Sequence, residues 1–126
     1  MHVTVGAVAL RDLSRSHNGD SSASVRARVE RARVTQRQRF ARKHGITCNA
    51  FAIGRWLDAH TPVHAEARTL LQTAAERLGL SARGYHRVLR VARTLADLDG
   101  ADKVGRVHLA EALSYRALAD EVRRAA

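Results

Sequence analysis

The sequence is poor in residues that break helices and in residues that cross-link small domains. It contains one proline, Pro62, and one cysteine, Cys48, in 126 residues. A single cysteine excludes an internal disulfide and any zinc site built from several cysteines, and it fits the reducing cytoplasm. Because only 4% of the residues are aromatic, leucine, valine and alanine must fill the core. We therefore predict a cytoplasmic domain that is held together by aliphatic packing.

Long apolar runs are also missing. Residues 1–10 are mostly apolar, but this segment is about half as long as a membrane-spanning helix. It lacks a basic leader and is followed by Arg11 and Asp12, so we expect neither a signal peptide nor a membrane span. No membrane partner is expected.

Two motifs of phosphoryl transfer are absent from these 126 residues. There is no Gly-x-x-x-x-Gly-Lys-Ser/Thr loop, and no apolar strand ends in paired acids that could hold magnesium. Phosphoryl transfer needs a phosphate cradle, a metal and a positioned water, so we expect no ATP hydrolysis, no catalytic residue and no bound cofactor for the chain alone. His60 and His64 resemble a metal pair, but Pro62 separates them and no third ligand is near, so no metal site is predicted.

Arginine supplies almost all of the positive charge, and lysine is rare. Lys43 and Lys103 are the only lysines, while lysine and arginine together number 22 against 12 acids, for a net charge of +10. Such a charge favours a polyanionic partner such as nucleic acid, nucleotide phosphate or an acidic protein. The alternative is that the arginines only form a solvated surface. The total charge does not distinguish these two interpretations, so the arrangement of the arginines must decide between them.

Helix-forming residues dominate what remains. We predict an all-α fold, a small bundle of about four main helices at residues 22–43, 61–78, 81–98 and 105–123, with a short helix at 53–59. Serine caps the first helix and Gly45 ends it, while Thr61 and Pro62 begin the second and Gly79 ends it. Residues 1–20 are predicted to be an extended arm, and residues 21–126 the helical domain.

Each long helix has an apolar face at helical spacing. In the first it comprises Val25, Val29, Ala32 and Phe40; in the second Val63, Ala67, Leu70, Leu71, Ala74 and Leu78. The third buries Tyr85, Val88, Leu89, Ala92, Leu95 and Ala96, and the fourth Leu109, Ala110, Leu113 and Ala117. The opposite side of the third helix is expected to carry Arg83, His86, Arg87, Arg90 and Arg93.

The third helix and the start of the fourth carry a family resemblance. Residues 80–98, LSARGYHRVLRVARTLADL, and residues 108–116, HLAEALSYR, resemble the C-terminal domain of magnesium-chelatase-like AAA+ ATPases of the ComM/YifB type. Ser21, Ser22, Arg26 and Val29 match the same family upstream, as do Gly45-Ile46 and Cys48-Asn49. Residues 2–5 resemble the last strand of its ATPase core. Gly84 and His86 depart from the family, which usually has alanine and an acid there.

The resemblance implies the lid of an ATPase whose core is not among these residues. In such lids a "sensor-2" arginine reaches the terminal phosphates of the nucleotide, and Arg83 matches that position, with Arg87 and Arg90 as supporting phosphate-binding residues. ATP and magnesium would bind only with a matching AAA+ core, which with neighbouring subunits would be the partner. The complete protein would remodel DNA at the expense of ATP. The alternative function is a freestanding basic module that binds nucleic acid non-specifically through its arginine-rich helices.

Overall fold

The computed structural model describes residues 6–7, 19–42 and 45–125. In order, its elements are α2 (Ser22–Arg39), the 3₁₀ helix η1 (Asn49–Phe51), α3 (Arg55–Ala59), α4 (Ala65–Arg77), α5 (Ala82–Leu98) and α6 (Arg106–Ala125). The predicted all-α bundle with four main helices is confirmed. The predicted arm, residues 1–20, lies almost wholly outside the described residues. Within the described part, no helix is both long and apolar enough to cross a membrane.

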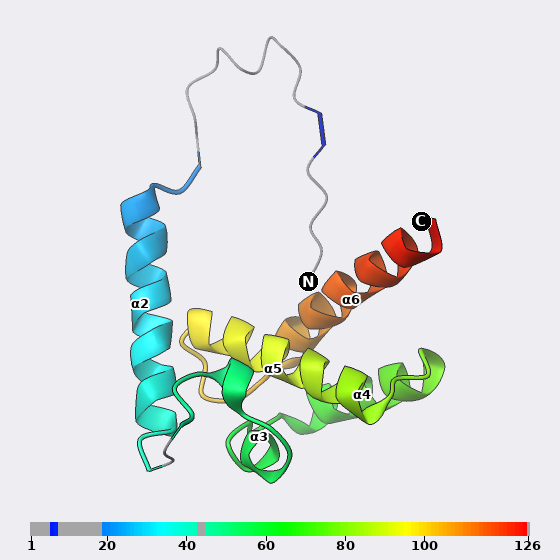
Figure 1. The fold of residues 1–126 in the computed structure, drawn as a ribbon, viewed down its shortest axis with the longest axis horizontal. Coiled ribbons are helices and arrows are strands. Elements are labelled where there is room, and N and C mark those ends of the chain that lie inside the picture. The colour runs from blue at the N-terminus through cyan, green and yellow to red at the C-terminus, as the bar shows by residue number, and fades with distance from the viewer. Residues whose placement is uncertain (1–5, 8–18, 43–44, 126) are drawn as a thin grey trace.

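Helix α5 is the central element of the bundle. It contacts α2, η1 and α6, and α6 also contacts α4. In Figure 1, α5 runs through the middle, α2 stands upright at one side, and the C-terminal half of α6 diverges from α5. The core includes residues of α3, α4, α5 and α6 together with Phe40, the residue that follows α2; Leu57, Leu71, Leu89 and Leu109 are among them.

Helix α2 is anchored only through its C-terminal part. Ser21 caps its start by accepting a hydrogen bond from the Ser24 amide, yet residues 21–31 are all exposed. The predicted stripe is therefore half wrong: Ala32 and Phe40 are buried, whereas Val25 and Val29 are 37% and 44% exposed. The helix also ends at Arg39 rather than near Lys43: Phe40 is its C-cap, with φ −104° and ψ 11° outside the helical range, and its side chain is buried in the core.

The segment between α2 and α4 differs from the prediction in two places. The 3₁₀ turn η1 precedes α3, and Gly54 separates them with a positive φ of 49° that favours glycine. Helix α4 begins at Ala65 rather than at Thr61 and Pro62. The reason is that Val63 forms an isolated parallel bridge with Val104, in which the Val104 amide donates to the Pro62 carbonyl at 2.8 Å.

Helices α4 and α5 end in the same way. Gly79 and Gly100 have φ values of 56° and 71°, and the next residues, Leu80 and Ala101, donate to carbonyls five positions back. These are Schellman motifs, which satisfy the last carbonyls of each helix. The prediction that Gly79 ends its helix is confirmed, although Leu78 beside it is exposed rather than buried.

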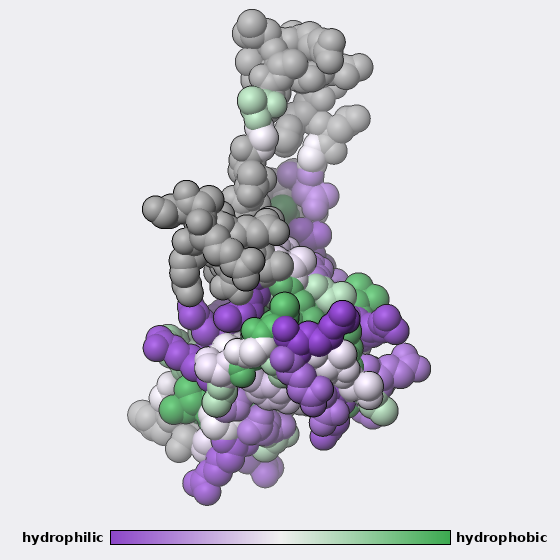
Figure 2. All heavy atoms as spheres, turned by 90° about the vertical axis from the view of Figure 1, so that its right-hand side faces the viewer, coloured by the Kyte–Doolittle hydropathy of each residue, from purple (hydrophilic) through white to green (hydrophobic). Residues whose placement is uncertain are grey.

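The predicted apolar face of α5 is correct and that of α6 only partly so. Val88, Leu89, Ala92 and Ala96 are buried, and Tyr85 and Leu95 pack against the core. On α6 Leu109 is buried as predicted, but Ala112 is buried where Ala110 was expected; Ala117 lies outside the described side chains. Figure 2 shows a gathering of apolar atoms bordered by hydrophilic residues.

Candidate functional site on helix α5

The first turn of α5 exposes a guanidinium beside free helix amides. Ser81 caps the helix by accepting a hydrogen bond from the Gly84 amide at 3.2 Å, and no acid lies in the first turn. Arg83 is exposed and makes no hydrogen bond or ion pair with any residue that the structure describes. A helix N-terminus carries a partial positive charge and orients its amides outward, so this turn attracts anions.

A second guanidinium lies against the same turn. A Cβ atom added at Gly84 would lie 3.4 Å from Nη1 and 3.6 Å from Cζ of Arg116. Arg116 comes from α6 and is half-buried, so the two helices meet closely at the start of α5. The glycine, which the sequence marks as a departure from the family, thus lies where a larger side chain would contact Arg116.

Arg87 and Arg90 lie one and two turns further along α5 and line one pocket, whereas Arg83 does not line it. Arg90 is held in place, because its Nε donates to the His86 carbonyl at 3.3 Å and its Nη1 donates to the Ala50 carbonyl at 3.0 Å. Arg87 is exposed and has no bonding partner among the described residues. The three predicted phosphate-binding arginines therefore share one helix but differ in their bonding: Arg90 makes hydrogen bonds within the fold, whereas Arg83 and Arg87 make none with the described residues.

Arg93 contradicts the sequence prediction. It was expected on the exposed side of the third helix, but only 1% of it is exposed. Its Nε donates to Asp97 Oδ1 at 3.0 Å, and Nη1 and Nη2 donate to the carbonyls of Asp102 and Ala101. The guanidinium therefore serves as hydrogen-bond donor to two backbone carbonyls of the turn that follows α5. It is buried because these carbonyls and Asp97 surround it.

Asp97 joins three parts of the chain. Its carboxylate accepts hydrogen bonds from Arg93, from Arg39 at the end of α2, and from Asn49 Nδ2 of η1 at 2.8 Å. Asn49 also accepts from Arg39 and donates to Thr94. Because a buried carboxylate is costly unless it is paired, this cluster, named here the Asp97 network, fixes α2 and η1 against α5.

The ionisation of this network follows from its contacts. Burial alone would raise the pKa of Asp97, but the hydrogen bonds from Arg39 and Asn49 and the charge of Arg93 outweigh it, so its pKa lies below the ordinary value. Burial lowers the pKa of Arg93, and the Asp97 carboxylate opposes that change. The cluster holds two guanidinium groups against one carboxylate, so it is a structural element with a net positive charge.

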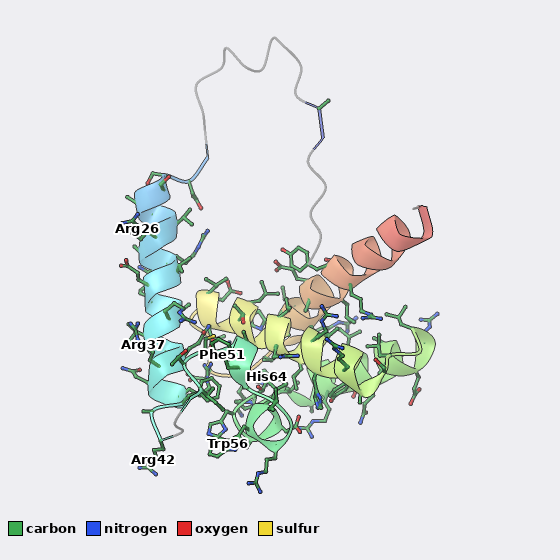
Figure 3. All side chains as sticks on the ribbon, viewed as in Figure 1. Arg26, Arg37, Arg42, Phe51, Trp56 and His64 are labelled. Carbon is green, nitrogen blue, oxygen red and sulfur yellow. The ribbon has the colours of Figure 1, made fainter. Side chains whose placement is uncertain are left out.

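Outside α5, exposed arginines are concentrated along α2. Arg26, Arg28, Arg31 and Arg37 are exposed, and Glu30 is the only acid within the helix. Arg28 pairs with Asp20 at 3.4 Å. Figure 3 shows Arg26 and Arg37 on the side of α2 that faces away from the other helices.

Of His60, His64 and Cys48, two have structural partners, namely His60 and Cys48. His60 lies stacked on Trp56, with Nδ1 2.9 Å from the Trp56 carbonyl, and His64 precedes α4. No group of three potential metal ligands occurs among the described residues. Burial raises the pKa of the Cys48 thiol, but Arg33 and the amides of Ala50 and Phe51 outweigh that effect and lower it. Sequence reasoning missed Arg33 because it lies fifteen positions upstream.

Known proteins match this domain over most of its length. The family "Magnesium chelatase, subunit ChlI C-terminal" matches residues 19–116. The competence protein ComM of Haemophilus influenzae is 38% identical over 100 residues, and the uncharacterised protein YifB of Salmonella typhimurium is 40% identical over 100 residues. An uncharacterised protein of Mycobacterium tuberculosis is 42% identical over 99 residues.

These alignments cover 79% of this chain but only 19–20% of each relative. The chain therefore spans about a fifth of the length of the curated relatives that it matches. The matched region includes α2, the Asp97 network and the arginines of α5. The chain belongs to the family of the C-terminal domain of the magnesium chelatase subunit ChlI, and it is similar to the corresponding part of ComM and YifB.

Proposed function

We propose that this domain is the lid of an AAA+ ATPase of the ComM/YifB type and that Arg83 is its sensor-2 arginine. The observation that carries the proposal is the difference among the arginines of α5. Arg93 is buried and Arg90 is bonded to two carbonyls. Arg83 is exposed at the helix start and has no partner among the described residues, so it is available to an anion.

The chemistry of this turn suits the terminal phosphates of a nucleotide. Arginine stays charged at physiological pH and binds phosphate oxygens through two parallel hydrogen bonds, and the amides of a helix N-terminus favour the same charge. The magnesium that accompanies ATP would be held by the core, since no cluster of potential metal ligands occurs in the described part of this chain. The bound nucleotide would supply the phosphoryl group that is transferred.

Arg87 and Arg90 would support Arg83. They lie at i+4 and i+7 from it, so they share its side of the helix. Two donors of Arg90 are already committed to backbone carbonyls, which leaves fewer for a phosphate. We therefore expect the contributions to decrease from Arg83 to Arg87 and Arg90.

The partner in this proposal is an ATPase core, or a neighbouring subunit that carries one. The chain covers 19% of ComM of Haemophilus influenzae, so the remaining four-fifths of that relative have no counterpart here. In the complete protein we propose ATP-driven remodelling of DNA. The domain by itself would be non-enzymatic and would show no ATP hydrolysis above buffer.

The test is to fuse or mix the domain with a ComM/YifB-type core that has its own phosphate loop. Arg83→Ala should lower hydrolysis by on the order of 100-fold, as is typical when a donor to developing charge is removed. Arg87→Ala and Arg90→Ala are matched controls on the same helix and should have smaller effects. An equal loss in all three variants would contradict a specific role for Arg83 and would indicate a diffuse positive field.

A second function is supported by the exposed arginines of α2. They lie on a helix whose residues 22–31 are all exposed and whose start stands apart from the other helices in Figure 1, so they can approach phosphates spaced along a nucleic acid. Arginines that contact phosphates give affinity without reading the sequence of bases. We propose this non-specific binding as the alternative to the nucleotide role.

Salt dependence tests the alternative. Binding of a labelled duplex to the isolated domain should weaken steeply between about 50 and 200 mM salt, by about one power of the salt concentration for each phosphate contact. Replacing Arg26 and Arg37 together by glutamine should reduce the slope by about two. Replacing Arg68 and Arg77 of α4 is the control. Binding that ignores salt, or that prefers one sequence, would contradict this function.

A further inference from the structure

A groove lies where α5, α6 and η1 meet, and neither proposed function uses it fully. Its cavity volume is about 610 Å³, within the range of about 300–1,000 Å³ typical of binding pockets. Its floor consists of Val91, Leu95 and Leu98 of α5. Val91 and Leu95 also pack against the core below, so the floor is fixed by the same packing that holds the bundle together.

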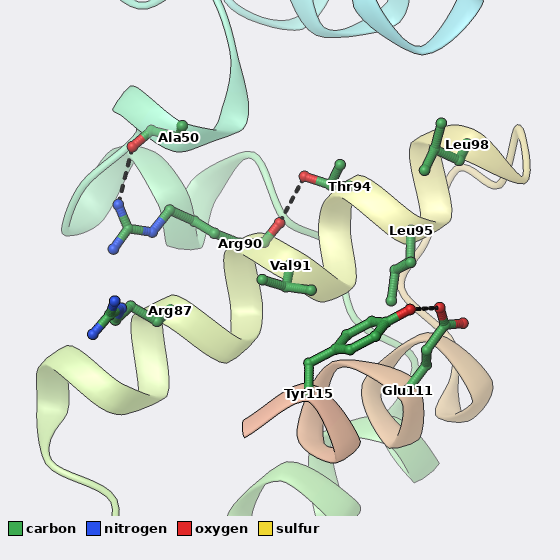
Figure 4. Close-up of a pocket in the computed structure, with 9 residues that line it drawn as sticks. All are labelled: Ala50, Arg87, Arg90, Val91, Thr94, Leu95, Leu98, Glu111 and Tyr115. Atoms are coloured by element: carbon green, nitrogen blue, oxygen red, sulfur yellow. Dashed lines mark hydrogen bonds between the residues drawn. The ribbon is translucent and has the colours of Figure 1, made fainter. Parts of the chain in front are cut away.

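The two ends of the groove differ in charge. Figure 4 shows Arg87 and Arg90 at one end and the pair Glu111 and Tyr115 at the other, with Val91 between them. The Tyr115 hydroxyl donates to Glu111 Oε1 at 2.8 Å, so the phenol already has its acceptor. At the opposite end the guanidinium of Arg87 has no partner among the described residues. The groove therefore offers an aliphatic floor with one unsatisfied cation at its edge.

This combination selects among possible occupants. A free phosphate would use the arginine but not the aliphatic floor. A nucleic acid would bring its phosphates near Glu111, and the floor itself is aliphatic, with Tyr115 as the single aromatic residue of the lining. A second copy of this chain is disfavoured because both copies carry a net charge of +10. An apolar peptide segment with a carboxylate uses both the floor and Arg87.

We propose that this groove binds a protein partner through a short apolar segment that is preceded by an acidic residue. The apolar side chains lie on Val91, Leu95 and Leu98, and the carboxylate pairs with Arg87. Arg90 shapes the same end while it stays bonded to the Ala50 carbonyl. The proposal does not depend on nucleotide sensing by Arg83, because Arg83 does not line the groove.

The test uses the ¹⁵N-labelled full chain without nucleotide or core, in about 150 mM salt to screen non-specific attraction. The probe is a capped peptide of two glutamates followed by Leu-Leu-Ala-Leu-Leu, and its matched control replaces both glutamates by lysine. The acidic peptide should shift the amide signals of residues 87–98 and of η1. The lysine peptide should bind at least about tenfold more weakly, which corresponds to about 1.4 kcal/mol.

Three variants locate the binding site. Val91→Asp places a carboxylate on the floor and should lower the affinity for the acidic peptide at least about tenfold. Arg87→Gln should lower it about threefold to tenfold and should reduce the preference for glutamate over lysine. Arg68→Gln, an exposed arginine of α4 outside the groove, is the control and should bind as the original chain does.

Several results would overturn the proposal. Equal affinity for the acidic and the lysine peptides would remove the role of Arg87, and shifts confined to α2 would place binding elsewhere. Retained binding by a folded Val91→Asp chain would remove the role of the floor. If that variant does not fold, Arg87→Gln decides, because its side chain is exposed. Self-association through the groove, seen as sedimentation of a dimer without peptide, would identify a second copy as the occupant.

Discussion

Arg83 and Arg93 lie on the same helix, ten residues apart, and the fold uses them in opposite ways. Arg83 is exposed at the start of α5 without a partner among the described residues. Arg93 is buried near the end and bonded to Asp97 and to two carbonyls. At ~3.6 residues per turn the two lie about 80° apart around the helix. Two residues of the same type therefore have different roles, and the carbonyl and carboxylate groups within reach of each guanidinium decide which role it has.

The largest expected effect tests the buried end of this comparison. Asp97→Ala should lower the free energy of unfolding by about 3–5 kcal/mol, because it leaves two guanidinium groups without their carboxylate. Urea unfolding followed by circular dichroism measures it. Asp20→Ala, at an exposed pair with Arg28, is the matched control and should cost no more than about 1 kcal/mol. A similar cost in both variants would mean that the Asp97 network adds little to stability.

The dependence of stability on pH should also test the Asp97 network. Because the pKa of Asp97 is lower in the folded protein than its ordinary value of 3.8, the unfolded chain binds this proton more readily. The stability that Asp97 contributes is therefore complete above about pH 4–5 and is lost as the pH falls through the lowered folded pKa. Asp97→Asn should be less stable at neutral pH and should show a smaller further loss between pH 4 and 2. If Asp97→Asn loses as much stability between pH 4 and 2 as the original chain does, the acid-induced loss does not come from Asp97.

A smaller effect is expected at Gly84, between the two arginines. Its backbone φ is not in the left-handed region, and replacing glycine by alanine inside a helix gains up to about 1 kcal/mol, which is an upper bound for Gly84 as the third residue of α5. The added Cβ would meet Arg116 Nη1 at 3.4 Å, which is ordinary contact. Gly84→Ala should therefore raise the free energy of unfolding by about 0.5–1 kcal/mol. A loss instead would indicate that Arg116 cannot move aside.

The smallest effect tests the exposed end. Arg83→Ala should change the free energy of unfolding by no more than about 0.5 kcal/mol, as is usual for exposed positions without partners. Arg93→Ala in the same assay is the contrasting variant and should be severely destabilised. If the two substitutions cost the same, the distinction between the ends of α5 would be wrong.

Sequence periodicity predicted the fold well where packing is local. The apolar face of α5 was predicted correctly because Val88, Leu89, Ala92 and Ala96 recur at helical spacing. The start of α4 was predicted wrongly, because Thr61 and Pro62 resemble a helix start while the bridge between Val63 and Val104 holds the segment extended. That bridge joins residues about forty positions apart, which no local pattern indicates.

The candidate site was predictable only in part. A family resemblance identified the stretch that carries Arg83, Arg87 and Arg90. Periodicity placed Arg93 with them because a charged residue is usually exposed. Its burial depends on Asp97 and on the carbonyls of the following turn, and Arg39 reaches the same carboxylate from 58 residues away. The groove likewise needs three elements to meet, so it could not be read from any one of them.

The Asp97 network has a consequence for the order in which the chain folds. Seven residues separate α5 from α6, so these helices pay little entropy to meet, whereas Arg39 must close a loop of 58 residues to reach Asp97. We expect the α5–α6 pair to form early and α2 to dock last. In the native state α2 should then detach as a separate unit, and its amides should exchange with solvent through openings that leave α5 protected.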